Sequence, residues 1–364
     1  MSAPLPLQTT PTGSFTSPPT PPATEEKSST IIPQILAAVR RHRDGHSLSA
    51  GKHWLRFPLD VYEYGDLESQ LRKVNLWDHY EHKLRHDYFP SANIFVLRMP
   101  GSLHESFLSY ITKDFLRQLD IIAQSDSPSA VFAGDIENSA SAEINFEDPE
   151  YGPHQPDASF QHPEAQYPGV ILELSYSQKK RDLPRLANEY ILGSDADIRV
   201  VIGIDVEYKG SKKASVSIWH PQIGVNDMGE KELVALQTVT DQLFRDDVGN
   251  LVSDPQAILQ LRLEDFGTEA FGAKFTDLTQ SIHISAESLF HFLERAEAKA
   301  RRLKQKEGLV RSTKPWVRKR RRDSTPPEQL DSDREGIYAE QEQRAAKKAM
   351  KDDGSYKASS SKQK

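Results

Sequence analysis

Three stretches decide the fold predicted for this chain: PDASFQH at residues 156–162, PGVILELSY at 168–176 and IRVVIGIDVEY at 198–208. The last two are dominated by apolar and β-branched side chains, a pattern typical of buried strands. Between them, the spacing of Leu, Ala, Tyr and Ile predicts a helix over residues 183–191, with Asp182 as N-cap and Gly193 at its end. Strands joined through a helix in this order indicate an α/β fold.

Residues on both sides extend this core. Apolar side chains at three- and four-residue spacing predict an amphipathic helix over residues 102–122. Ser102 followed by Glu105 matches a capping box at the start of this helix. Alternation at 142–146 predicts a first strand, and alternation at 212–219 predicts a strand that pairs with 198–208. The predicted order is helix, three strands, helix and two strands.

Composition divides the chain into a folded body and polar ends. The N-terminal extension shows a short helical pattern at 31–41, a strand-like stretch at 54–64, and two strands, 84–88 and 94–98, that form a hairpin. The predicted parts are a disordered Pro/Thr/Ser-rich tail (1–30), an N-terminal extension packing on the core (31–100), the α/β domain (101–275), a basic helix and neck (285–322), and a disordered charged tail (323–364).

The composition also excludes several classes of protein. The chain contains no Cys, which rules out disulfides, thiolate catalysis and Cys-based zinc or iron–sulfur sites. No apolar run reaches the roughly 18 residues that a membrane span needs. The first 30 residues lack the charged start and apolar stretch of a secretory signal. We therefore expect a soluble intracellular protein.

The net charge of −7 conceals an asymmetry along the chain. Residues 295–322, which we call the basic neck, contain 13 Lys/Arg and 2 Asp/Glu, whereas residues 1–294 carry a net charge of −17. A nucleic acid would be attracted to the basic neck and repelled by much of the body.

A pair of carboxylates carries the predicted chemistry. Side chains alternate along a strand, so Glu173 and Ser175 point to the same face. If the strand that begins near Asp157 lies next to that of Glu173, both carboxylates converge on one divalent cation. Two carboxylates with water suit Mg²⁺, which lowers the pKa of bound water and stabilises charge on a phosphodiester. Such sites commonly add a Lys to offset developing negative charge.

Pro156-Asp157 followed by Glu173-Leu174-Ser175, within this order of elements, resembles the PD-(D/E)XK nuclease superfamily, the restriction-endonuclease-like fold. The longer run over 156–208 resembles an expanded group of uncharacterised fungal proteins with this fold. The resemblance implies a restriction-endonuclease-like core and a site for Mg²⁺ or Mn²⁺. It assigns the functional positions as follows: Asp157 and Glu173 as metal ligands, Glu105 as a further acid, Ser175 where the family has Lys, and Gln178, Lys179 or Lys180 as assisting residues.

Each of these positions also has a structural interpretation. Glu105 fits the capping box, Ser175 fits a hydroxyl beside the core, and Lys179 and Lys180 fit a solvated basic cluster. The basic neck has two interpretations that do not depend on the fold, a nuclear localisation signal read by an import receptor or a surface for nucleic acid. The cations that carry them are Arg301, Arg302, Lys304, Lys306, Arg318, Lys319, Arg320, Arg321 and Arg322. We expect a nuclear protein, otherwise a cytoplasmic one.

Two functions from different classes follow. The first is a Mg²⁺-dependent nuclease acting on DNA or RNA. The second is a catalytically inactive nuclease-fold protein that serves as a binding module or scaffold in the nucleus, favoured by Ser175 in place of the family's Lys and by the acidic body. A third possibility is that the basic neck alone binds nucleic acid without sequence preference.

Overall fold

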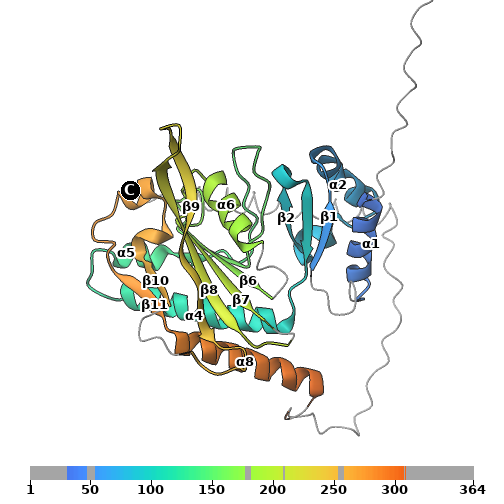
Figure 1. Cartoon of the computed structure of the whole chain (residues 1–364). Coiled ribbons are helices and arrows are strands. Elements are labelled where there is room, and N and C mark those ends of the chain that lie inside the picture. The colour runs from blue at the N-terminus through green and yellow to red at the C-terminus, as the bar shows by residue number, and fades with distance from the viewer. Residues whose placement is uncertain are drawn as a thin grey trace, which may run out of the picture. The chain divides into compact units, whose positions relative to one another are not determined.

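Figure 1 shows the computed structural model of the chain. The structure describes residues 31–46, 54–176, 182–207, 210–252, 258–306 and 308, and all but the last belong to one compact unit that ends at Glu307. The predicted tails, 1–30 and 323–364, lie outside the described residues. The described chain is mixed α/β, as predicted.

A six-stranded sheet forms the centre, with strand order β4-β5-β6-β7-β8-β9. β6 and β7 are parallel and joined through helix α6, because a parallel pair needs a crossover connection, and the remaining neighbours are antiparallel. The bounds are β4 (Glu137–Asn138), β5 (Ala158–Gln161), β6 (Val170–Ser175), α6 (Leu183–Gly193), β7 (Val200–Val206), β8 (Ala214–Val225) and β9 (Lys231–Arg245).

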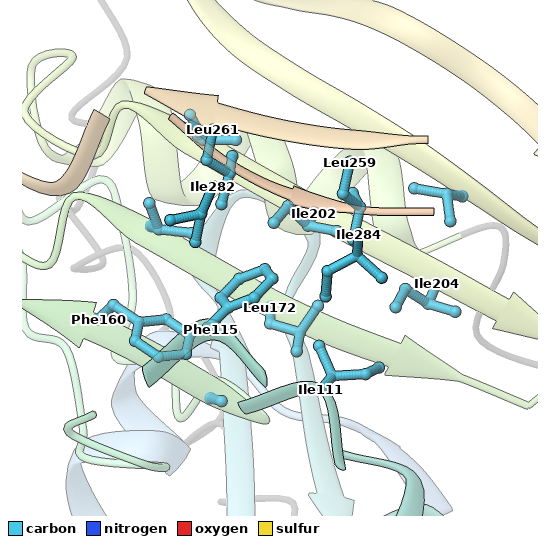
Figure 2. Packing of buried hydrophobic residues seen from close by; sticks show 14 of the residues in the cluster. Ile111, Phe115, Phe160, Leu172, Ile202, Ile204, Leu259, Leu261, Ile282 and Ile284 are labelled. Atoms are coloured by element: carbon cyan, nitrogen blue, oxygen red, sulfur yellow. The ribbon is translucent and has the colours of Figure 1, made fainter. Parts of the chain in front are cut away.

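One face of the sheet buries mainly apolar side chains. Leu172 of β6 and Ile202 and Ile204 of β7 pack with Ile111 and Phe115 into one cluster (Figure 2). The elements that contribute to this cluster are α4 (Ser102–Ala123), α5 (Ala130–Asp135), β10 (Leu259–Arg262), η2 (Leu263–Phe266), α7 (Glu269–Gly272), β11 (Ser281–Ile284) and α8 (Ala286–Gln305). Transfer of these side chains out of water is the main driving force for this face.

The other face of the sheet holds α6 and a second, smaller sheet. Ile171, Val201 and Trp219 pack against α6 and against Phe89 and Val96 from the small sheet. The small sheet is antiparallel, with order β1-β3-β2, and three helices cover its far side. The bounds are α1 (Ile31–Arg43), β1 (Trp54–Pro58), α2 (Val61–Lys73), α3 (Trp77–Lys83), β2 (Arg85–Phe89), η1 (Pro90–Ala92) and β3 (Ile94–Arg98).

Alternation explains why the small sheet can lie between two layers. In β3, Phe95 and Leu97 point to the cluster formed with α1–α3, whereas Ile94 and Val96 point to the central sheet. Arg98 ends the strand in register with the second set. The N-terminal extension therefore packs on the core through one complete face of a hairpin.

Two strand predictions are wrong. Residues 142–146 form no strand, because Ile144 pairs only through an isolated bridge with His154, and β4 lies earlier in the chain. The predicted strand 54–64 ends at Pro58, which has no backbone N–H to donate. Asp60 then begins helix α2, since its carboxylate accepts from the Glu63 amide while Glu63 accepts from the Asp60 amide.

The capping box predicted at Ser102 and Glu105 is also wrong. Gly101 is the N-cap residue, Ser102 is the first residue of α4, and no side chain caps this end. Glu105 lies in the first turn and pairs with Arg85 instead. A tertiary ion pair with Arg85 thus replaces the local hydrogen bonds of the predicted capping box.

Helix α8 belongs to the apolar core, although the sequence placed 285–322 outside it. Leu289, Leu293 and Ala296 are fully buried in the same cluster as Phe115. Strand β9 was not predicted. It is the last strand of the sheet, and its alternating polar and apolar residues fit its alternation of exposed and half-buried positions.

Candidate functional site

Asp157 and Glu173 lie next to each other at the boundary between the central and small sheets. β5 and β6 are antiparallel with Ala158 opposite Leu172, so the residue before β5 lies beside Glu173. The Leu174 amide donates to Asp157 Oδ2 at 2.7 Å, which fixes this carboxylate against β6. Both carboxylates are 1% exposed.

Arg98 stands between the two carboxylates. Its Nη1 lies 3.2 Å from Asp157 Oδ1 and 3.1 Å from Glu173 Oε2. The other edge of the guanidinium contacts Asp87, with Nε at 2.9 Å from Oδ2 and Nη2 at 3.1 Å from Oδ1. Nη2 also donates to the Gln155 carbonyl. A side chain from β3 therefore supplies a cation at the point where the two carboxylates meet.

Further donors complete the arrangement. Arg85 Nη1 lies 3.0 Å from Asp157 Oδ1, and the Arg85 Nη2 reaches Glu105 at 2.9 Å. The Tyr190 hydroxyl of α6 donates to Glu173 Oε1 at 2.8 Å. We call Arg85, Asp87, Arg98, Asp157 and Glu173 the ion cluster; it joins β2, β3, β5 and β6.

His154 extends the ion cluster towards α6. Its Nδ1 lies 3.4 Å from Asp87 Oδ1, and its Nε2 lies 3.5 Å from Glu189 Oε2. Burial lowers the pKa of His154, but the contacts with Asp87 and Glu189 outweigh burial and raise the pKa above its ordinary value. When protonated, this imidazole is a further buried cation between Asp87 and Glu189.

The electrostatics favour a permanently charged Arg98. Burial opposes its charge, yet Asp87, Glu173 and Asp157 together raise the pKa of Arg98 well above its ordinary value. Burial and the neighbouring Glu173 carboxylate raise the pKa of Tyr190, which keeps its hydroxyl a donor. Each buried carboxylate of the ion cluster consequently faces a fixed donor.

The ion cluster does not fit Mg²⁺ or Mn²⁺. Asp157 already accepts from Arg85, Arg98 and the Leu174 amide, and His104 Nε2 lies 3.1 Å from its Oδ2. A carboxylate offers about four lone-pair positions, so these contacts leave none for a metal. A guanidinium stays protonated, so Arg98 cannot become neutral and leave these oxygen atoms to a metal ion. Within the described ranges, no group of three or more His, Asp or Glu side chains is arranged to hold a metal ion.

The other predicted site residues are placed as follows. Ser175 is fully buried, and its Oγ has no hydrogen-bond partner among the residues that the structure describes. Glu105 is about half exposed, and the neighbouring imidazole of His104, with Nδ1 3.7 Å from Oε1, lowers its pKa. Gln178, Lys179, Lys180 and the run of Arg318, Lys319, Arg320, Arg321 and Arg322 lie outside the described residues. Arg301, Arg302, Lys304 and Lys306 are exposed in the last turn and C-cap of α8.

The sequence interpretation missed the cations of the ion cluster. Arg85 and Asp87 alternate with His86 and Tyr88 along one strand, and Arg98 ends the paired strand, so all three charges share one face of the hairpin. The signal available in the sequence was that Arg85 and Asp87 share their face of the strand with the apolar Phe89, which indicates that the face is buried. His86, which lies between Arg85 and Asp87 in this strand, is 4% exposed.

Comparisons of the chain with protein-family models, with curated proteins and with solved structures found no match. None of the described helices is long and apolar enough to cross a membrane. The function is therefore argued from the geometry of the site.

Proposed function

We propose that this chain is a non-catalytic binding module or scaffold, built on a nuclease-like α/β fold in which an arginine takes the position of the metal ion. The observation that carries the proposal is Arg98 Nη1, which lies within 3.2 Å of both Asp157 and Glu173. In this proposal the ion cluster is structural: it fixes the small N-terminal sheet on the central sheet.

Burial supports the proposal. A polynucleotide cleaved at Asp157 and Glu173 would have to bring a phosphodiester within reach of both side chains, and each is 1% exposed beneath β2 and β3. Opening this surface would separate Arg85 and Arg98 from their carboxylate partners. Buried charges that lose their partners cost several kcal/mol, roughly 3–5 for one pair.

Ser175 gives independent support. The resemblance to the nuclease superfamily places a Lys at this position, and a neutral hydroxyl offers no charge to a developing oxyanion. The net charge of −17 over residues 1–294 also opposes the approach of a nucleic acid to the body.

The Mg²⁺-dependent nuclease is the alternative that the experiment below tests, although Arg98 rather than a metal ion lies between the two carboxylates. The proposed nuclear location and the import receptor or nucleic acid as partner rest on the basic neck. Residues 301–306 of the basic neck are exposed and include Arg301 and Arg302, whereas Ala296 at its start is buried in the apolar cluster.

Calorimetry on the full chain tests the proposal directly. We expect the wild type and an Asp157→Asn/Glu173→Gln double variant to give the same calorimetric trace with millimolar Mg²⁺ or Mn²⁺. We also expect the wild type not to cleave single- or double-stranded DNA or RNA. Arg98 is the reason, since a metal ion would have to displace it. Glu232→Gln, an exposed change on β9, is the matched control.

The opposite result is equally clear. Metal binding and nucleic-acid cleavage that both disappear in the double variant, and persist in Glu232→Gln, would overturn the proposal in favour of the nuclease.

A further inference from the structure

A cavity of about 360 Å³ lies between the N-terminal helices and the loop that leads into β5, outside the ion cluster. Residues of α2, α3 and β2 line one side, and Glu143, Asn145, Pro153 and Gln155 line the other. Its size is at the lower end of the range for small-molecule sites.

Aromatic rings form a wall of this cavity. Tyr64, Trp77 and Tyr80 all line it. Trp77 and Tyr80 have ring centroids 5.6 Å apart, and Tyr64 stacks on Tyr88 at 3.9 Å. Packing against neighbouring rings holds this wall in place, so it is present before any ligand binds.

Carboxylates complete the lining. Glu68, Glu81 and Glu143 line the cavity from three different segments, and their side chains are 36–55% exposed. None of the described lining residues is a Lys or Arg. A hydrogen bond from His86 lowers the pKa of Glu143, which keeps this carboxylate ionised at neutral pH.

Two neighbouring groups bear on the ligand chemistry. Arg72 pairs with Glu68 at 2.8 Å and lies 4.3 Å from the Trp77 ring centroid, so an organic cation already stacks at this edge. His86 also lines the cavity; its Nε2 pairs with Glu143 at 3.2 Å, whereas Nδ1 is buried without a hydrogen-bond partner among the described residues. With the proton on Nε2, Nδ1 is an acceptor with unused capacity.

We propose that this cavity binds an alkylammonium group. The carboxylates of Glu81 and Glu143 offset the charge of the ammonium group, and the alkyl chain packs against the rings of Trp77 and Tyr80 that line the cavity. The inference rests on the proposed function, since a binding module needs a ligand. The ammonium group comes either from a free amine or from a Lys side chain of a partner protein.

Titration of the full chain tests this site with two probes. Butylammonium represents a free amine, and a short peptide with one central Lys represents a protein partner. Butanol and the same peptide with acetyl-lysine are the uncharged controls. Binding is followed by calorimetry and by Trp fluorescence.

We expect at least one charged probe to bind and both uncharged controls to fail. Glu143→Gln and Trp77→Leu should each weaken binding about tenfold, the size of one lost charge-assisted hydrogen bond or cation–π contact. Glu232→Gln, which removes a carboxylate outside the cavity, should leave affinity unchanged, and circular dichroism checks that each variant folds.

Binding of the peptide alone would assign the site to a protein partner, and binding of butylammonium to a small amine. The inference is overturned if neither charged probe binds, if butanol binds equally well, or if the two cavity variants bind like the wild type. The metal and cleavage assays use different residues, so this failure leaves the proposed function standing.

Discussion

The two faces of β6 are buried in different ways, although the residues concerned are adjacent in the sequence. Leu172 and Leu174 point into a purely apolar cluster, whereas Glu173 between them points into the ion cluster. All three are at most 1% exposed. Burial on the first face is favourable by itself, but burial on the second is favourable only while every charge keeps its partner. Apolar packing therefore tolerates approximate partners, and the ion cluster does not.

Removal of Arg98, the central cation of the ion cluster, should lower stability more than the other substitutions below. Arg98→Met leaves Asp87, Asp157 and Glu173 buried without it, and we expect the free energy of unfolding to fall by about 3–5 kcal/mol. Urea unfolding measures this loss. Arg56→Met on β1, an exposed position, is the matched control and should change stability by less than about 0.5 kcal/mol.

A combined variant separates charge from packing. Adding Glu173→Gln to Arg98→Met should recover part of the lost stability, because Glu173 then no longer carries the charge that Arg98 balanced, whereas Asp157 keeps Arg85 as a partner. A combined variant less stable than Arg98→Met would contradict the structural role of the ion cluster.

Truncation on the apolar face gives the counterpart. Leu172→Ala should lower the free energy of unfolding by about 2–4 kcal/mol, from lost transfer energy and the cavity left behind. Because no titratable group is removed, the loss should be the same from pH 6 to pH 8. A loss that changes strongly with pH in chemical denaturation would show that the two faces are coupled.

A single donor of the ion cluster tests a smaller effect. Tyr190→Phe removes the hydroxyl that donates to Glu173 Oε1, and we expect a loss of about 1–2 kcal/mol in the free energy of unfolding. Tyr62→Phe, at a residue that is 89% exposed, is the control. Equal stability of the two variants would mean that Glu173 does not depend on α6.

The pH dependence of His154 sharpens the comparison further. Its pKa is raised in the folded state, so its stabilising contribution is complete below about pH 6.5, the value of a free imidazole, and is lost as pH rises through the folded pKa. The stability difference between wild type and His154→Gln should therefore shrink as the solution becomes alkaline.

Urea unfolding at several pH values measures this difference. The same change at exposed His291 controls for the loss of an imidazole. A difference for His154→Gln that stays constant or grows with pH would contradict a buried imidazolium.

The sequence predicted the elements whose signal is local. Uninterrupted apolar runs identified β6 and β7, and three- and four-residue spacing identified α4 and α6. Pro58 and the capping box at Asp60 were equally local signals, yet the strand-like residues around them concealed the start of α2. Strand β9 was missed because it has no continuous apolar run: its residues alternate between half-buried and exposed positions.

Prediction of the site reached Asp157 and Glu173 on the condition that their strands are neighbours, and β5 and β6 are indeed paired. It could not reach Arg98, which is 59 residues from Asp157 and comes from a separate sheet. The local signal, that Arg98 shares a hairpin face with Arg85 and Asp87, does not show that this face packs on β5 and β6.

The sequence by itself thus determined the α/β class and two buried strands joined through a helix, because strand alternation and helix periodicity depend only on near neighbours. It made the convergence of the two carboxylates conditional on the pairing of their strands. The tertiary structure decided what lies between those carboxylates. Packing of the N-terminal hairpin against the central sheet brings the guanidinium of Arg98 to that point, and a contact between residues far apart in the chain arises only when two layers meet.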